Sequence, residues 1–360
     1  MSRENDKEVD KENDKETSDQ NGADARFDSA VEVPMVRALH GAAKVHSARP
    51  PHDTIHFRLH YPARWTGADS ERLTGILPAD PSLAPWPVAI VLPGINVGSD
   101  GYRWLAVALA GAGIATVTFD FVDELMPGNV ALSPGLDVTA VAPDSYGRRP
   151  SGTALAPLVS AVQRMTKEGP AAGLVDTGRI LLVGHSAGGT VALENASTDW
   201  LPGLRGVATY GAHTMPAVML GHPHGTVLPM PSEVPTLLMA GTDDGVIRAS
   251  ADRYQPTDDH DPVRRTFHEA CRHRLSRLVM IERASHMVMA HNGDSTSARG
   301  FLDAPPTPES MRVDGEVRCL MAGLLLSFAR SVLASEPSDD LSHLDEFADH
   351  DGVAAWEVKS

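Results

Sequence analysis

Short apolar runs alternate with longer amphipathic segments through the middle of this chain. The segment Thr54–Tyr61 alternates apolar and polar residues, which is typical of a half-exposed strand. Later runs are dense in Val, Ile, Leu and Met, and continuous apolar runs of this length predict strands covered on both faces, as in a parallel sheet. These runs are Val88–Leu92, Ile114–Phe119, Ile180–Val183, Gly206–Tyr210, Thr236–Ala240 and Leu278–Ile281.

The segments between the apolar runs include candidate crossover helices. They are Tyr102–Ala110, Thr153–Lys167, Thr190–Ala196, Pro262–Arg274 and Glu316–Leu333. Strands and helices that alternate in this way predict one α/β domain with a mostly parallel central sheet and helices on both faces.

The two ends of the chain differ from this middle part. Residues 1–30 are polar and acidic, and they offer too little apolar surface to offset the entropy of ordering, so we predict a disordered acidic tail. Residues 335–360 are also acidic and are predicted to form a C-terminal tail, in which Trp356 either docks onto the domain or stays in a loose segment. The domain itself is expected to span residues 31–334.

The formal net charge of −16 lies mostly in these two ends and therefore says little about a substrate. Because no basic patch could follow a phosphate backbone, nucleic acid is not an expected partner. No apolar run approaches the length of a membrane span, and the N-terminus lacks an apolar signal region, so the expected location is cytoplasmic. Cys271 and Cys319 are expected to be free thiols. The oligomeric state is left open.

A glycine-rich motif follows one of the apolar runs directly. Ile180–Val183 leads into Gly-His-Ser-Ala-Gly at 184–188, and the following residues can continue as a helix. A serine on a sharp strand-to-helix turn presents its hydroxyl clear of the sheet, and the flanking glycines avoid side-chain clashes. Ser186 is therefore the predicted nucleophile, whereas the neighbouring His185 is interpreted as a packing residue.

A nucleophilic serine needs a general base, and the base needs an orienting acid. Asp243 and Asp244 both follow the run Thr236–Ala240, and we favour Asp244, because it stands three residues after a glycine and three before an isoleucine. His286 follows the last predicted strand by a few residues and is the predicted base. His291 is the nearest rival, but it lies further from that strand.

Two backbone N–H groups must stabilise the oxyanion that forms when a serine attacks a carbonyl. Ala187, directly after the nucleophile, is expected to supply one of them. Ile95, in the Pro-Gly turn after Val88–Leu92, is expected to supply the other. The side chain of Asn96 either adds a donor or only stabilises that turn.

Two irregular segments are candidates for the walls of a pocket. Val122–Pro150 is interrupted by prolines and glycines, and it either lies over the carboxyl edge of the sheet or forms a surface loop. His213–Pro231 contains methionines and a leucine that suit an apolar wall or plain core packing. His222 and His224 could bind a metal but lack a convincing third ligand, so neither a metal nor a cofactor is predicted.

Taken together, these motifs resemble the α/β-hydrolase superfamily, and most closely its dienelactone-hydrolase and chlorophyllase-like branch. The resemblance extends from about Thr54 to Leu333 and rests on the Pro-Gly turn at 93–94, the Ser186 motif, Gly-Thr-Asp-Asp at 241–244 and Ala-Ser-His at 284–286. Dienelactone hydrolases carry a cysteine nucleophile, and this chain carries Ser186 instead.

The expected activity is hydrolysis of a small-molecule carboxylic ester through an acyl-enzyme, with Ser186, His286 and Asp244 as the triad. The same residues could serve a thioesterase, an amidase or an acyltransferase. A binding protein that keeps the fold without turnover is a less favoured interpretation.

Overall fold

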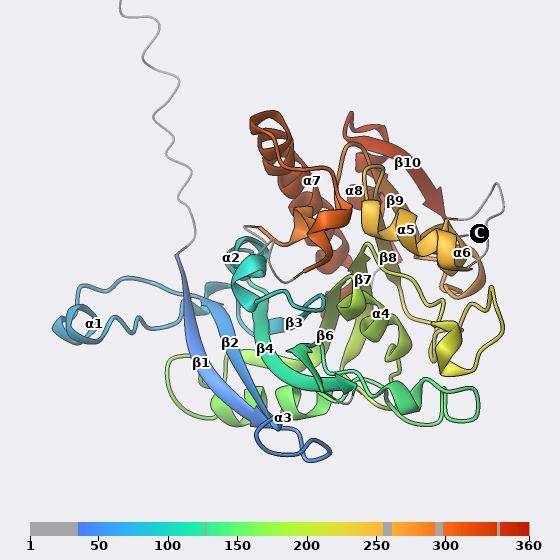
Figure 1. The fold of residues 1–360 in the computed structure, drawn as a ribbon. Coiled ribbons are helices and arrows are strands. Elements are labelled where there is room, and N and C mark those ends of the chain that lie inside the picture. The colour runs from blue at the N-terminus through green and yellow to red at the C-terminus, as the bar shows by residue number, and fades with distance from the viewer. Residues whose placement is uncertain (1–34, 127, 255–260, 292–297, 337–338, 360) are drawn as a thin grey trace, which may run out of the picture. The chain divides into compact units, whose positions relative to one another are not determined.

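The computed structural model describes residues 35–126, 128–254, 261–291, 298–336 and 339–359. The tail predicted for residues 1–30 lies outside the described residues. Residues from Pro34 onward form a single unit built around one large sheet (Figure 1).

The described strands join in a ten-stranded sheet with the order β1-β2-β4-β3-β6-β7-β8-β9-β10, and β5 pairs with β4 outside this path. In chain order the strands are β1 (Val36–Lys44), β2 (Thr54–Pro62), β3 (Trp86–Leu92), β4 (Ala115–Met126), β5 (Asn129–Leu132), β6 (Val175–His185), β7 (Leu204–Tyr210), β8 (Thr236–Gly241), β9 (Arg277–Ile281) and β10 (Val353–Val358).

The central strands β4, β3, β6, β7, β8 and β9 are parallel. The pairs at both edges of the sheet and the pair β4–β5 are antiparallel. All residues of β3 and β8 are buried, as the continuous apolar runs predicted. The predicted mixed α/β architecture with a mostly parallel sheet is therefore confirmed. Because the carboxyl ends of parallel strands meet at one edge, the loops after β3, β6, β8 and β9 come together there.

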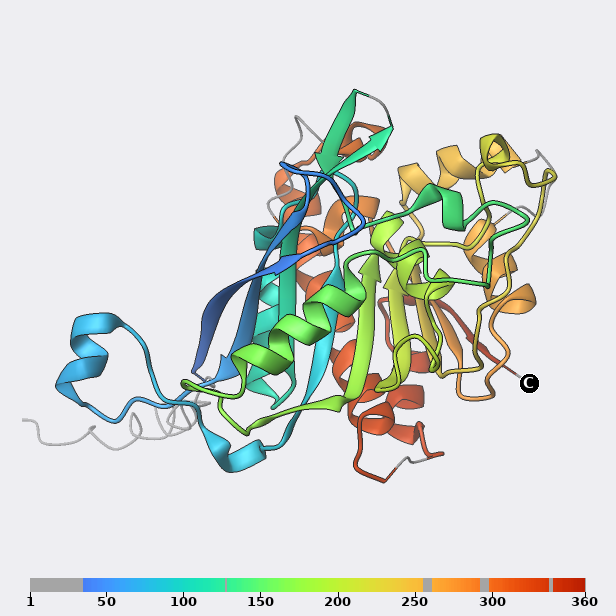
Figure 2. The same ribbon diagram turned by 90° about the horizontal axis from the view of Figure 1, so that it is seen from below.

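The helices cover both faces of the sheet. They are α1 (Asp69–Thr74), α2 (Arg103–Gly111), α3 (Leu155–Met165), α4 (Ala187–Glu194), α5 (Gly245–Tyr254), α6 (Pro262–Glu269), α7 (Pro308–Val332) and α8 (Ser342–Asp345). Apolar side chains of α3, α4 and α6 join one buried cluster, and those of α2 and α7 join another. The ribbon in Figure 2 shows helices on both sides of the sheet. Among the described residues, none of these helices combines the length and the apolar character that crossing a bilayer requires.

The acidic C-terminal segment, set apart as a tail on sequence grounds, contributes an edge strand in its described part. β10 pairs antiparallel with β9, and Trp356 packs against one of the two buried clusters. Two of the acidic residues that suggested a solvated tail have basic partners on the domain: Asp345 pairs with Arg277 at 2.7 Å, and Glu357 pairs with Arg264. The acidic composition therefore concealed a segment that belongs to the sheet.

Candidate active site

Ser186 lies at the sharp turn between β6 and α4. β6 ends at His185 and α4 begins at Ala187, so one residue makes the whole turn. Its backbone has φ 54° and ψ −125°, a strained conformation for a residue with a side chain. Such strain is commonly stored where it holds a functional group in place, and here it leaves Ser186 lining a pocket.

The glycines of the motif are required by close backbone approach. A Cβ atom on Gly188 would lie 2.2 Å from the carbonyl oxygen of Leu92, and one on Gly184 would lie 2.4 Å from the Cα of Gly189. Both distances are far below van der Waals contact. The spacing Gly-x-Ser-x-Gly is therefore the spacing that lets α4 start directly against β6 and the end of β3.

His286 and Asp244 form a buried pair. The Nδ1 of His286 lies 2.8 Å from Oδ2 of Asp244, and their exposed fractions are 2% and 3%. The second oxygen, Oδ1, accepts a hydrogen bond from the Ile247 N–H at 2.7 Å. Since the carboxylate accepts a hydrogen bond from Nδ1–H, the ring proton stays on Nδ1 and Nε2 of His286 is left as the basic nitrogen.

The rival residues lie elsewhere. Asp243 is exposed and makes no contact with His286, although its backbone N–H bonds to the carbonyl of Ala284. His291 is also exposed, and its backbone N–H bonds to the carbonyl of Gly101. The structure therefore brings together the aspartate and the histidine that the sequence favoured.

Asp303 joins the loops that carry this pair, and no sequence signal pointed to it. Its Oδ1 accepts from the N–H of Gly245 at 2.9 Å, and its Oδ2 accepts from the N–H of Met287 at 3.1 Å. Gly245 follows Asp244 and Met287 follows His286, so one carboxylate links both residues of the pair. Burial raises the pKa of Asp303, and these N–H donors oppose the rise.

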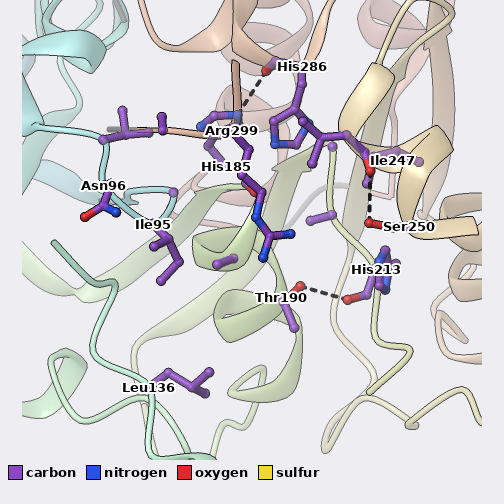
Figure 3. Close-up of a pocket in the computed structure, with 18 of the residues that line it drawn as sticks. Ile95, Asn96, Leu136, His185, Thr190, His213, Ile247, Ser250, His286 and Arg299 are labelled. Carbon is purple, nitrogen blue, oxygen red and sulfur yellow. Dashed lines mark hydrogen bonds between the residues drawn. The ribbon is translucent and has the colours of Figure 1, made fainter. Parts of the chain in front are cut away.

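Ser186, His286, Ile95 and Ala187 line the same pocket, which has a volume of about 590 Å³ (Figure 3). The N–H groups of Ile95 and Ala187 donate no hydrogen bond to any residue that the structure describes. The hydroxyl of Ser186 likewise has no partner among the described residues. Donors left open at a pocket are what an oxyanion needs, and serine–histidine bonds often tighten only when substrate is bound.

Asn96 fastens the turn that carries Ile95. It has φ 58°, its N–H donates to the carbonyl of Leu132 at 2.9 Å, and its Oδ1 accepts from the Leu132 N–H at 3.1 Å. Both bonds run to the end of β5. Of the two roles considered for Asn96, stabilisation of the turn is the one that these contacts display.

His185 is the centre of a hydrogen-bond chain and not only a packing residue. The N–H of Gly94 donates to Oη of Tyr102 at 2.9 Å, Oη lies 2.9 Å from Nδ1 of His185, and Nε2 of His185 lies 3.0 Å from the carbonyl of His286. A carbonyl can only accept, so Nε2 carries the proton and Nδ1 accepts from Tyr102. Burial lowers the pKa of His185 to about 3, so the ring is neutral.

This chain connects three segments that are distant in sequence: the Pro-Gly turn, the serine turn and the histidine loop. Its direction is fixed at both ends, because a backbone N–H can only donate and a backbone carbonyl can only accept. The sequence could not reveal it, because Tyr102 is separated from His185 by 83 residues.

The two irregular segments do wall the pocket. Val122–Pro150 begins as the end of β4 and the short strand β5, and its residues Leu125, Leu136 and Val141 line the cavity. From the second segment, Met215 and Leu220 line it. Of the other methionines there, Met219 is exposed and Met230 packs against the core.

Polar side chains also line the cavity away from Ser186. Figure 3 shows Arg299 extending into it from one side and Thr190 and His213 lying together on another. Thr190 donates its hydroxyl to the carbonyl of His213 at 2.8 Å, and burial lowers the pKa of His213 to about 4. Glu194, at the last position of α4, is a further lining residue.

Within the described ranges, no group of three or more His, Cys, Asp or Glu side chains is arranged to hold a metal ion. His222 instead places its Nε2 2.6 Å from the carbonyl of Val141. Cys271 is a buried free thiol, and Cys319 is an exposed one.

Because comparison with known proteins gave no match, a functional interpretation rests on the geometry of this site. No protein-family model matches the chain. No curated protein matches its sequence.

Proposed function

We propose that this protein is a serine hydrolase of the α/β-hydrolase superfamily that cleaves a carboxylic ester through an acyl-enzyme. The observation that carries the proposal is the strained Ser186 on its strand-to-helix turn, lining one pocket with a buried His286–Asp244 pair. A nucleophile, an orienting acid and a base follow one another along the chain in the order expected for this superfamily.

The chemistry proceeds in two halves. Nε2 of His286 takes the proton of the Ser186 hydroxyl as Oγ attacks the ester carbonyl, and the N–H groups of Ala187 and Ile95 stabilise the oxyanion. His286 then gives its proton to the departing alcohol, which leaves an acyl-serine. In the second half His286 deprotonates a water molecule, which attacks the acyl-serine. His286 then returns this proton to Oγ of Ser186 as the Oγ–acyl bond breaks, and the carboxylic acid is released.

Asp244 supports both halves of the reaction by accepting a hydrogen bond from Nδ1–H of His286. This hydrogen bond fixes the tautomer that exposes a basic Nε2, and the carboxylate stabilises the imidazolium while it exists. The neutral His185 ring beside it, with ring centroids 4.9 Å apart, adds no competing positive charge.

The test is covalent labelling with a fluorophosphonate probe, combined with turnover of p-nitrophenyl esters of increasing chain length. We expect the wild type to be labelled at Ser186, and Ser186→Ala to lose both labelling and turnover. Ser250→Ala is the matched control, because Ser250 lines the same pocket but bonds to the carbonyl of Val246. A folded wild type that is neither labelled nor active would overturn the proposal.

A further inference from the structure

One face of α4 runs along the pocket from the nucleophile to a buried acid. Ala187, Thr190 and Glu194 all line the cavity. Residues at this spacing lie on the same side of a helix. With a rise of about 1.5 Å per residue, Glu194 lies about 10 Å along the helix from Ala187. Helical side chains point back toward the helix N-terminus, so the carboxyl of Glu194 reaches toward Ser186.

The carboxyl of Glu194 is only partly satisfied by the protein. Its Oε2 lies 3.2 Å from the hydroxyl of Ser151, which itself accepts from Nδ2 of Asn195 at 2.8 Å. Its Oε1 has no hydrogen bond to any described residue. Since Oε1 is not among the side-chain atoms that are both fully enclosed and unpaired, it opens onto the cavity.

A carboxyl in this position is costly unless something else binds to it. Glu194 is 3% exposed, and burial raises its pKa to about 7. An unpaired buried polar group costs roughly 1–3 kcal/mol. The walls around it that come from the irregular segments are largely apolar, with Leu136, Val141 and Leu220 among them. The free oxygen is therefore one of a few polar groups in a cavity with apolar walls, and such groups fix the orientation of a ligand in a binding site.

We propose that Glu194 forms a subsite for the acyl group of the substrate and accepts a hydrogen bond from a hydroxyl at the far end of that group. The separation of about 10 Å along the helix sets an upper scale for the length of chain between the ester carbonyl and the hydroxyl. This inference rests on the proposed ester hydrolysis at Ser186 and adds the class of substrate, a hydroxyacyl ester.

The charges around the pocket favour a neutral hydroxyl over a charged group. A chain ending in an ammonium group would bring a second positive charge out of water into a cavity that already holds the guanidinium of Arg299 (Figure 3). A chain ending in a carboxylate would meet Glu194 itself. A hydroxyl meets neither repulsion, and Oε1 can accept its hydrogen bond whether Glu194 is protonated or ionised.

The first experiment compares two p-nitrophenyl esters of equal chain length, one ending in methyl and the other in hydroxyl. The quantity measured is the ratio of their kcat/KM values, which cancels general damage to the active site. We expect the ratio of hydroxyl to methyl ester to fall about tenfold in Glu194→Leu. Glu194→Gln keeps an acceptor oxygen and should retain most of the preference.

The second experiment requires neither turnover nor a folded Glu194 variant. Calorimetry on the Ser186→Ala protein measures the binding of two ketones in which a methylene replaces the ester oxygen, one ending in methyl and the other in hydroxyl. We expect the hydroxyl ketone to bind about tenfold more tightly.

The outcomes separate the two proposals. Absence of turnover with any ester contradicts the proposed function, and the ketone pair still decides the subsite. Turnover with the same ratio in the wild type and in Glu194→Leu contradicts the subsite alone, as do ketones of equal affinity. Preference for an ester ending in ammonium or carboxylate overturns the assignment of a hydroxyl.

Discussion

The two ends of the pocket differ in how completely their polar groups are paired. At the end next to Ser186, the Ser186 hydroxyl and the N–H groups of Ile95 and Ala187 are open within the described part of the chain, but the side chains that support this end are fully paired. Both oxygens of Asp244 and both ring nitrogens of His185 have protein partners. At the end near Glu194, one of the two carboxyl oxygens has none among the described residues. The first end is held by hydrogen bonds to backbone groups of short turns, whereas the second is walled by long irregular segments.

This difference suggests different roles for the two ends of the pocket. A network whose members are all satisfied holds its groups in one geometry, which proton transfer requires. A carboxyl oxygen with no protein partner leaves a hydrogen bond for a ligand to make. Under the proposed function, this comparison assigns the chemistry to the end next to Ser186 and recognition of the acyl group to the end near Glu194.

The largest effect is expected at the paired end, from Asp244→Asn. In this variant the amide oxygen keeps the bond from the Ile247 N–H, and the amide NH₂ then faces Nδ1 of His286 as a donor. His286 is therefore held in the wrong tautomer, and kcat should fall about 10⁴-fold. The measurement is kcat with a p-nitrophenyl ester, on protein whose fold is checked by circular dichroism. Asp243→Asn is the matched control, since Asp243 is exposed and should leave kcat within about twofold. Loss of activity in Asp243→Asn but not in Asp244→Asn would mean that Asp243, and not Asp244, orients His286.

A smaller effect is expected at the unpaired end, in the pH dependence of stability. The pKa of Glu194 is raised from 4.5 to about 7, so the folded protein holds this proton more tightly than the unfolded chain does. The free energy of unfolding of the wild type should therefore fall as pH rises through this window, by up to about 3 kcal/mol from this residue. Below the lower value the contribution is fully present.

Glu194→Gln lacks this titration. The difference in free energy of unfolding between the wild type and the variant, measured by urea denaturation at several pH values, should therefore change in favour of the variant as pH rises. Glu269→Gln is the control, because Glu269 is exposed on α6. A difference that stays constant from pH 4 to pH 8 would show that Glu194 is not held in a protonated state.

The smallest effect concerns the hydrogen-bond chain through His185. Tyr102→Phe removes the hydroxyl between the Gly94 N–H and the His185 ring, and it leaves both unpaired. Unfolding should cost about 2 kcal/mol less, and kcat should fall about tenfold while KM changes little. Tyr61→Phe, which loses one buried bond to the carbonyl of Leu77, should lower stability and leave kcat unchanged. Equal kcat in both variants would mean that the chain only supports the fold.

The sequence predicts the parts of this molecule that are encoded locally. The buried strands appear as continuous apolar runs, and the serine turn appears as glycines at fixed spacing. The pairing of His286 with Asp244 follows from the order in which parallel strands deliver their loops to one edge. These features depend on neighbours in the chain, and the structure contains each of them as predicted.

Features that depend on distant partners are absent from the local pattern. Asp303 bonds to Gly245, which lies 58 residues away in the sequence. The segment of β10 forms a strand by pairing with the edge of β9, and its own sequence pattern does not predict that pairing. Glu194 lies inside the predicted helix Thr190–Ala196, but helical periodicity alone does not indicate which face borders a cavity. His185 was interpreted as a packing residue because its two partners come from other loops.

Under the proposed function, the pocket-lining positions of α4 lie at increasing distances from the nucleophile, which stands just before the helix. Each helical turn adds about 5.4 Å to this distance, so the position that carries the acceptor determines the length of the acyl group. The double substitution Thr190→Glu and Glu194→Thr moves the carboxyl acceptor about one helical turn toward Ser186. The preferred acyl group of this variant should be shorter by about the length of one helical turn, while the turn that carries Ser186 is unchanged in sequence.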